Sequence, residues 1–258
     1  MKRIITLTTD FGVSDGYVGA VKGVIKSINP EADITDISHH IPPQDILSAA
    51  FCLNTSSPYF PKNTIHVAIV DPGVGGKRKG ILVQTEKFSF IGPDNGLFSL
   101  VLRGRDIRRQ ISLENQRYFL NTLSSTFHGR DIFAPVAAYL CLGISPEQFG
   151  PRLEKLKSLD LPSPRVSARK ISGQIIHVDN FGNLITNITL EDFRMLPNPK
   201  IRIGKAMIGK ISRTYSDVPA GKLLAYTGSA GYLEIGQNLG NAATLLKVKA
   251  GAKVEVLK

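Results

Sequence analysis

Acidic residues beside glycine occur in three turn-like segments of this sequence, each after a run of apolar residues. The segments are Thr-Asp-Phe-Gly at 9–12, Val-Asp-Pro-Gly-Val-Gly-Gly at 70–76 and Gly-Pro-Asp-Asn-Gly at 92–96. They lack the Gly-Lys-Ser/Thr of a phosphate-binding loop and the Gly-x-Gly-x-x-Gly of a dinucleotide fold. A carboxylate at a strand end can accept hydrogen bonds from both vicinal hydroxyls of a ribose, which makes Asp10 a candidate sugar-binding residue. The alternative is that Asp10 only caps a turn.

A second candidate site combines a carboxylate, a guanidinium and an imidazole. Arg78 follows Asp71 by seven residues across a glycine-rich turn, and a guanidinium beside a carboxylate keeps that carboxylate ionised. His128 precedes an expected helix start, where the positive end of the helix disfavours the imidazolium. No metal is expected, because the sequence contains no His-x-x-x-His or Cys-x-x-Cys spacing.

Two later segments are rich in side-chain amides and hydroxyls around aromatic residues. They run from Val178 to Asn187 and from Thr227 to Asn238. Such groups suit a zwitterionic amino acid together with a purine. Two tight turns of a β-barrel explain the same residues equally well, so the residues alone leave both interpretations open.

The secondary-structure elements that must position these residues differ between the first and the second part of the chain. Over the first 165 residues, β-branched runs alternate with helical spacing, which predicts an α/β domain with a mainly parallel central sheet. Ligands of such sheets collect at the carboxyl ends of strands, where Asp10 and Asp71 both stand. Strands are predicted at 3–9, 33–37 and 64–70, a hairpin at 80–85 and 88–91, and helices at 17–28, 45–59, 96–102 and 131–143.

The pattern changes after a proline-containing stretch at 151–170, which has no clear period and is predicted to be a linker. Beyond it, short apolar runs separated by Gly and Asn predict a smaller β-barrel or sandwich with hardly any helix. We therefore expect an N-terminal α/β domain at 1–160 and a C-terminal β-barrel domain at 170–258. The predicted strands of the second domain are 173–178, 185–189, 200–203, 207–211, 222–227, 231–235 and 253–257.

Composition narrows the class of protein. Among 258 residues, 32 Lys and Arg against 21 Asp and Glu give a net charge of +11, which raises the question of nucleic acid. The densest basic runs, Lys77–Lys79 and Arg103–Arg109, lack interleaved aromatic residues, so no nucleic-acid partner is expected. No apolar run reaches the roughly 18 residues of a membrane span, and no signal peptide precedes the first strand. Two cysteines in apolar stretches fit reduced thiols, so a cytoplasmic protein is expected.

Taken together, six motifs resemble those of the S-adenosyl-L-methionine (SAM) hydroxide adenosyltransferases, which are related to fluorinase and chlorinase. They are the three acidic turns above, Thr-Phe-His-Gly-Arg-Asp at 126–131, Asp-Asn-Phe-Gly-Asn at 179–183 and Gly-Ser-Ala-Gly-Tyr-Leu-Glu-Ile at 228–235. Each motif is weak alone, but six in the family's order across nearly the whole chain are highly specific.

The resemblance implies an N-terminal α/β domain, a C-terminal β-barrel domain and a homotrimer with its sites at subunit interfaces. It also implies that water-derived hydroxide displaces methionine from the ribose C5′ of SAM and releases adenosine, with SAM as substrate and no cofactor. Asp71, Arg78 and His128 match the family's catalytic triad, and Asp10 matches the carboxylate that holds the ribose hydroxyls. The other substrate-binding positions implied are Asp179, Phe181, Asn183, Tyr215, Ser229, Tyr232 and Glu234.

The implied chemistry gives each member of the triad a task. Asp71 or His128 takes the proton of the water, and Arg78 stabilises the hydroxide and holds Asp71. A neutral His128 beside an ionised Asp71 favours the histidine as the base, which is a hypothesis.

Two other functions are carried as alternatives. A halide adenosyltransferase is the nearer one, but the halogenating members lack the Asp and His found here at positions 71 and 128. The fluorinating members also carry an insertion where this chain runs directly from Thr85 to Ile91. A non-catalytic adenosine-binding protein is the second alternative, and the presence of all three triad positions argues against it.

Overall fold

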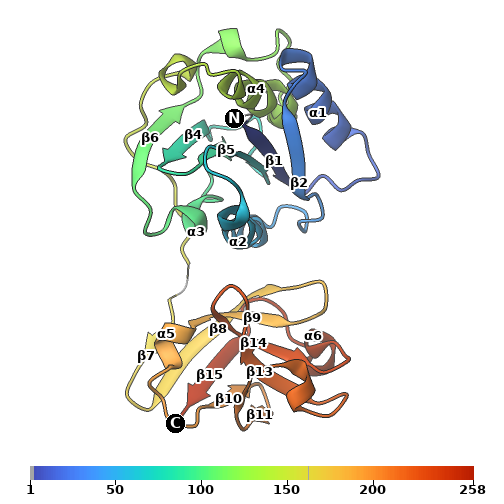
Figure 1. The fold of residues 1–258 in the computed structure, drawn as a ribbon, viewed down its shortest axis with the longest axis vertical. Helices are drawn as coiled ribbons and strands as arrows, with labels where there is room; N and C mark the ends of the chain where they lie inside the picture. Colours follow the sequence, from blue (N-terminus) through green and yellow to red (C-terminus); the bar gives the residue numbers. More distant parts are fainter. Residues whose placement is uncertain (1–2, 162) are drawn as a thin grey trace. The chain divides into compact units, whose positions relative to one another are not determined.

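Two compact units make up the computed structural model, which describes residues 3–161 and 163–258 (Figure 1). Unit 1 is Met1–Leu159 and unit 2 is Asp160–Lys258. Residues 151–159, predicted as part of a linker, are instead bound to unit 1. There the Leu153 amide donates to the Gln110 carbonyl, and the Lys157 amide donates to Asp94. These backbone groups find hydrogen-bond partners in unit 1, which a composition-based prediction of a linker does not reveal.

Unit 1 is built on a six-stranded sheet in the order β2-β1-β3-β5-β4-β6. The first four strands of this order are parallel, and β4 is antiparallel to both β5 and β6. The predicted mainly parallel α/β architecture is therefore confirmed, with β6 as an additional edge strand. The strands are β1 (Ile4–Thr9), β2 (Asp33–Ser38), β3 (Ile65–Ile69), β4 (Gly80–Thr85), β5 (Ser89–Pro93) and β6 (Ile107–Ser112).

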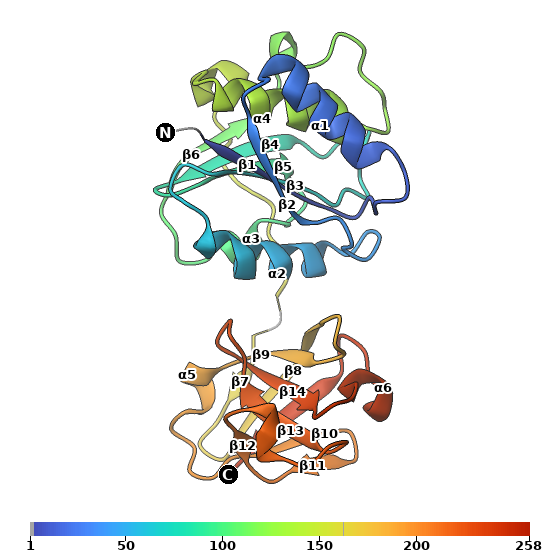
Figure 2. The same cartoon turned by 45° about the vertical axis from the view of Figure 1, so that its right-hand side comes forward.

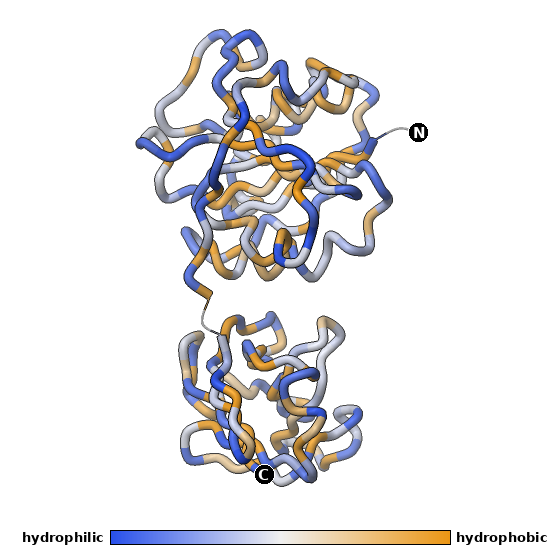
Figure 3. The backbone as a smooth tube through the Cα atoms, turned by 90° about the vertical axis from the view of Figure 1, so that its left-hand side faces the viewer, coloured by the Kyte–Doolittle hydropathy of each residue, from blue (hydrophilic) through white to orange (hydrophobic). Residues whose placement is uncertain are grey.

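Helices cover both faces of this sheet (Figure 2). α1 and α4 pack together on one face, and α2 and α3 lie on the other. Because both faces are covered, β3 and β5 are buried along their whole length, and Figure 3 shows hydrophobic strands inside the unit. The helices are α1 (Tyr17–Ile28), α2 (Ile46–Ser56), α3 (Ser99–Leu102) and α4 (Ala134–Cys141), with 3₁₀ turns at Ser57–Tyr59, Gln116–Tyr118 and Pro146–Phe149 and a π turn at Gly129–Phe133. Among the described residues, no helix is long and apolar enough to span a membrane.

Local sequence explains where the longer helices begin and end. α1 buries Val21 and Ile25, which lie four residues apart on one face, and it ends before Pro30, which cannot continue a helix. α2 begins after Asp45, whose Oδ1 accepts a hydrogen bond from the Ser48 amide at 2.9 Å. This cap satisfies one of the unpaired amides of the first turn.

Unit 2 is a nearly closed β-barrel, as predicted. Its strands follow the order β11-β10-β15-β8-β9-β14-β13-β12, and β7 pairs with β8. Burial alternates along β10, which is typical of a strand with one face in a core. The strands are β7 (Arg165–Val166), β8 (Lys170–Val178), β9 (Leu184–Thr189), β10 (Lys200–Ile203), β11 (Ala206–Ile208), β12 (Ile211–Ser212), β13 (Leu223–Thr227), β14 (Tyr232–Gln237) and β15 (Lys253–Leu257). The short helices are α5 (Leu190–Phe193) and α6 (Ala242–Leu246), with a 3₁₀ turn at Tyr215–Asp217.

Candidate active site

Three side chains form a continuous hydrogen-bonded chain at the carboxyl edge of the unit 1 sheet, close to the end of β3. Arg78 Nε donates to both carboxylate oxygens of Asp71, at 3.0 and 2.9 Å, and Arg78 Nη2 also donates to Oδ2. The same Nη2 lies 2.8 Å from Nδ1 of His128. The side chains of Asp71 and Arg78 are each 6 % exposed. One guanidinium therefore joins the carboxylate to the imidazole.

The contact with Arg78 determines which nitrogen of His128 carries hydrogen. A guanidinium only donates, so Nδ1 accepts and the neutral ring holds its hydrogen on Nε2. Burial and the positive charge of Arg78 lower the pKa of His128 from its ordinary 6.5, although the charges of Asp71 and Asp131 oppose this shift. The sequence attributes a neutral ring to a helix start, whereas the causes in the structure are burial and Arg78.

His128 stands immediately before the π turn at Gly129–Phe133, which leads into α4. Asp131 is completely buried within this turn. Its carboxylate accepts from the Ser124 amide at 2.7 Å and from Arg130 Nε at 2.6 Å. The loop that precedes His128 is therefore tied to the turn that follows it. Rare π turns are frequent at functional sites because they redirect side chains within a helix.

A close approach of two loops depends on Gly75. This residue has a φ of +74°, which favours glycine, and a Cβ atom added to it would lie 2.2 Å from the Ser125 carbonyl oxygen. The loop that carries Asp71 and Arg78 thus packs directly on the loop that precedes His128. The absence of a side chain at position 75 permits this close approach of the two loops that carry the triad.

A pocket of about 250 Å³ is lined by Asp71, His128 and Asp10. Asp10 follows β1, as predicted, and its Oδ2 accepts a hydrogen bond from the Gln44 amide at 2.8 Å. The volume is slightly below the usual range for small-molecule sites, so the pocket fits part of a nucleoside-sized ligand. Within residues 3–161 and 163–258, no three His, Cys, Asp or Glu side chains are placed to hold a metal ion.

Aromatic rings also line this pocket, and the sequence interpretation did not include them among the candidate residues. Phe11 and Phe127 both line the pocket and meet edge to face, with ring centroids 5.6 Å apart. Tyr17 packs on Phe127 at 5.3 Å. Position within a motif is the signal that could have identified Phe11 and Phe127, because each adjoins a predicted site residue.

In unit 2, the segment between β8 and β9 folds around Asp179. Its Oδ1 accepts hydrogen bonds from the amides of Phe181 and Asn183, at 2.9 and 2.8 Å, and its Oδ2 accepts one from Asn183 Nδ2 at 2.8 Å. Asn183 is buried, whereas Phe181 is 74 % exposed and presents its ring to the surroundings. These contacts confirm a tight turn and also leave an aromatic ring available for a ligand.

A second group in unit 2 surrounds Glu234. Tyr226 shares a hydrogen bond with Glu234, and its hydroxyl lies 2.6 Å from that of Tyr215. Burial and the negative charge of Asp179 raise the pKa of Glu234, although the hydrogen bond from Tyr226 opposes this shift. Tyr226 was not predicted as a site residue, because an aromatic residue within a predicted β-strand is usually part of the hydrophobic core.

Gly236 connects these two groups. A Cβ atom added there would lie 2.8 Å from Asn183 Oδ1 and 3.0 Å from the Tyr215 ring. Ser229 is exposed in the turn between β13 and β14, and Tyr232 is the first residue of β14. The Gly228 amide donates to the Tyr232 carbonyl at 2.9 Å and closes the turn. Seven predicted residues thus lie in unit 2, and contacts bring together Asp179, Phe181, Asn183, Tyr215 and Glu234.

Comparisons with known proteins extend over nearly the whole chain. Residues 5–150 match the SAM hydroxide adenosyltransferase N-terminal domain, and residues 173–255 match the C-terminal domain. A protein of Methanocaldococcus jannaschii named (R)-S-adenosyl-L-methionine hydrolase is 38 % identical, over 98 % of this chain and 95 % of its own. A Nocardia brasiliensis protein named fluorinase is 25 % identical, over 99 % of this chain and 97 % of its own.

A solved structure is similar at the same level. The crystal structure of an uncharacterized conserved protein from Thermotoga maritima shares 38 % sequence identity with this chain and has a TM-score of 0.93. The similarity covers 99 % of this chain and 100 % of the other. With both family domains matched in order, the chain belongs to the SAM hydroxide adenosyltransferase family.

Proposed function

We propose that this protein hydrolyses SAM to adenosine and L-methionine by attack of water-derived hydroxide on the ribose C5′. The observation that carries the proposal is the hydrogen-bonded chain from Asp71 through Arg78 to His128, beside a pocket that Asp10 also lines. Membership of the family and the names of relatives at 36–38 % identity support SAM as the substrate.

The reaction asks little of the enzyme at the leaving group. The C5′–O bond forms as the C5′–S bond breaks, and the sulfonium leaves as the neutral thioether of methionine. No general acid is needed, and none of these steps calls for a cofactor. The enzyme must supply a nucleophile in line with the breaking bond, about 3 Å from C5′ and shielded from bulk water.

The arrangement of the triad bears on the proton transfer. To act as a base, His128 would need its hydrogen on Nδ1, which would set two donors face to face at the 2.8 Å contact with Arg78. As placed, the ring instead donates from Nε2. We therefore assign the orientation of the water to His128 and the acceptance of its proton to Asp71, in place of the histidine base that the sequence favours. Arg78 stabilises the hydroxide that forms.

The remaining predicted residues are assigned to the ends of the substrate. Asp10 accepts hydrogen bonds from the two ribose hydroxyls. Residues of unit 2 bind the methionine and adenine ends, and the exposed ring of Phe181 supplies a flat apolar wall. These residues are Asp179, Phe181, Asn183, Tyr215, Ser229, Tyr232 and Glu234.

The assembly is inferred from the family resemblance, and the location from the two cysteines in apolar stretches. We propose a homotrimer with its sites at subunit interfaces, acting in the cytoplasm. Light scattering of the purified protein tests the trimer, and a mass equal to one chain contradicts it.

One experiment tests the reaction. The protein is incubated with SAM in heavy-oxygen water, with and without chloride or fluoride, and the products are separated by chromatography. Equal amounts of adenosine and methionine, with the label in the 5′ hydroxyl, are expected; supplying the R and S sulfonium forms separately shows which is used. Label absent from adenosine contradicts the mechanism, 5′-halo-adenosine supports the halide alternative, and tight adenosine binding without turnover supports a binding protein.

A further inference from the structure

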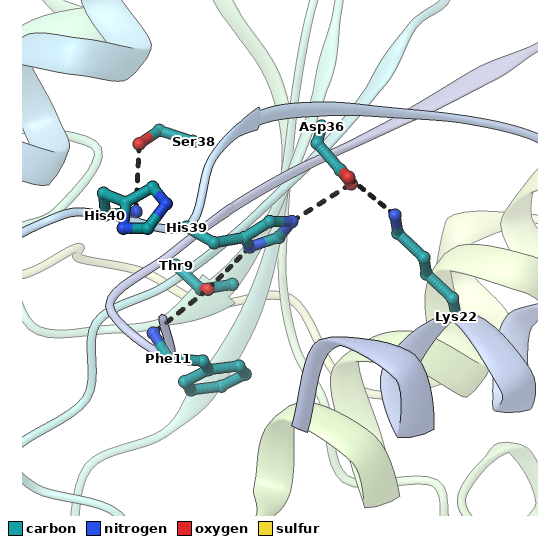
Figure 4. Close-up of polar contacts among 7 residues, drawn as sticks. All are labelled: Thr9, Phe11, Lys22, Asp36, Ser38, His39 and His40. Carbon is teal, nitrogen blue, oxygen red and sulfur yellow. Dashed lines mark hydrogen bonds and ion pairs between the residues drawn. The ribbon is translucent and has the colours of Figure 1, made fainter. Parts of the chain in front are cut away.

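A chain of polar contacts runs from the surface to the turn that carries Asp10 (Figure 4). Lys22 Nζ lies 2.6 Å from Asp36 Oδ2, and Asp36 Oδ1 lies 3.1 Å from His39 Nε2. The other ring nitrogen, His39 Nδ1, lies 2.8 Å from Thr9 Oγ1. His39 is 5 % exposed and Thr9 is 1 % exposed, so the inner part of the chain is shielded from water. The mechanism above uses none of these four side chains.

His39 contacts the turn at 9–12 at both of its ends. At the start of the turn, its ring bonds Thr9 Oγ1, which also accepts the Phe11 amide at 3.3 Å. At the end of the turn, its backbone carbonyl accepts the Gly12 amide at 2.8 Å. The backbone of this turn is therefore fixed from His39, which is carried by the segment that follows β2.

The direction of each hydrogen bond follows from the charges. Burial alone raises the pKa of Asp36, but its contacts with Lys22 and His39 outweigh burial and lower it, so this carboxylate only accepts. A carboxylate beside Nε2 favours a hydrogen on that nitrogen, which leaves Nδ1 to accept from the Thr9 hydroxyl and leaves Oγ1 free to accept the Phe11 amide. Nε2 contacts Asp36 at 3.1 Å without forming a hydrogen bond, whereas Nδ1 and the Thr9 hydroxyl are hydrogen-bonded at 2.8 Å.

Asp10 occupies the middle of the turn that these bonds fix. Its Oδ2 is held by the Gln44 amide, and its position relative to the pocket depends on the backbone on either side. A carboxylate that must meet two adjacent hydroxyls tolerates little displacement, because both hydrogen bonds require distance and angle together.

We propose that His39 is a positioning residue for substrate recognition: through Thr9 it fixes the turn that presents Asp10 to the two ribose hydroxyls. The inference rests on the proposed function, in which Asp10 binds the ribose. The simpler alternative is a buried threonine–histidine pair that only joins neighbouring strands. The same β1 strand supplies that comparison, because Thr6 Oγ1 lies 2.7 Å from Nδ1 of the fully buried His66, three residues before the turn.

The test compares Thr9→Val, Thr9→Ser and Thr6→Val with the wild type. Calorimetry measures the binding of adenosine and of 2′,3′-dideoxyadenosine, which lacks the hydroxyls, and kinetics with SAM gives KM and kcat. Thr9→Val should weaken adenosine binding about tenfold and raise KM similarly, the effect of one lost hydrogen bond to a charged group. Its binding of dideoxyadenosine should stay within about twofold, Thr9→Ser should restore adenosine binding, and Thr6→Val should change neither ligand.

Each outcome bears on a different statement. If Thr9→Val weakens both nucleosides equally, or weakens neither, the positioning role of His39 is wrong while the proposed function stands. If the wild type itself binds both nucleosides equally, the ribose role of Asp10 fails and the inference with it. If circular dichroism shows that Thr9→Val does not fold, His39→Asn takes its place. The side-chain oxygen of the asparagine keeps an acceptor near Thr9, so the preference for adenosine over dideoxyadenosine should stay within about twofold of the wild type. A variant that binds adenosine more weakly but dideoxyadenosine normally contradicts a contact made through Nδ1.

Discussion

Removing the guanidinium of Arg78 should both destabilise unit 1 and lower kcat. Asp71 accepts hydrogen bonds from both Nε and Nη2 of Arg78, and both side chains are 6 % exposed. In Arg78→Met, a largely buried carboxylate remains without its cation. Breaking a buried ion pair costs about 3–5 kcal/mol, and the lower end applies because Asp71 also lines an open pocket. A typical domain is stable by only about 5–15 kcal/mol, so the change is large.

The double variant Asp71→Asn/Arg78→Met is the matched control, because it removes both charges and nearly preserves shape. Relative to Arg78→Met, it should regain most of the lost free energy of unfolding, because no unpaired charge remains. It should not regain any of the lost activity. Arg78→Met should lose about 10²–10³-fold in kcat, the usual effect of deleting a donor to a developing anion, and the double variant should lose at least as much because it also removes the proton acceptor.

The assay follows from composition. The chain contains no tryptophan, so urea unfolding is followed by far-ultraviolet circular dichroism, and scanning calorimetry separates the transitions of the two units. The reasoning is refuted if Arg78→Met costs less than about 1 kcal/mol, the range of an exposed pair. It is also refuted if the double variant is no more stable than Arg78→Met.

Three further changes test other parts of the site. Gly75→Ala forces a Cβ atom against the Ser125 carbonyl, so the loop that carries Asp71 should separate from the loop that precedes His128. Adenosine release should then show a kcat lowered about 10²-fold. An unchanged kcat contradicts the loop contact. His128→Asn keeps an acceptor for Arg78 and a donor, so it should retain far more activity than His128→Ala, and equal loss would show that the ring takes the proton. Because protonating His128 sets donor against donor, wild-type kcat should fall with an acid limb below pH 6.5 that His128→Asn lacks. The pKa of Glu234 is raised, so the folded protein is favoured at low pH and loses stability as the pH rises. The stability of Glu234→Gln relative to the wild type, measured by urea unfolding, should therefore grow from pH 4 to pH 8. A constant difference contradicts the raised pKa.

Strand ends were predictable from sequence, whereas contacts between loops were not. Asp10 and Asp71 follow apolar β-branched runs. Parallel strands bring their carboxyl ends to one edge of the sheet, independently of how the loops are folded. The position of His128 depends instead on the glycine at position 75 and on a π turn, neither of which produces a periodic pattern. The sequence therefore identifies the triad members through the family motifs and leaves their order of contact open.

The β6 edge of the sheet escaped prediction for a related reason. β6 begins with exposed residues, among them Arg108 and Arg109. In the sequence, such a charged edge strand cannot be told from a solvated run of basic residues. Arg152, in the segment predicted to be a linker, forms a bridge with Ile111 of that same strand. Two segments without an apolar pattern thus complete the sheet through backbone hydrogen bonds, which depend little on side-chain type.

The charge of the triad also bears on the choice of nucleophile. A halide arrives as an anion and needs only donors and desolvation, so an unpaired guanidinium would suit it. Here Asp71 neutralises Arg78 through both of its carboxylate oxygens, and a further anion at that point would meet a carboxylate close by. Water carries no charge until it gives up its proton, and a carboxylate close to the guanidinium offers an acceptor for that proton. The same ion pair that disfavours halide therefore favours hydroxide formed within the site, which agrees with an enzyme that consumes water.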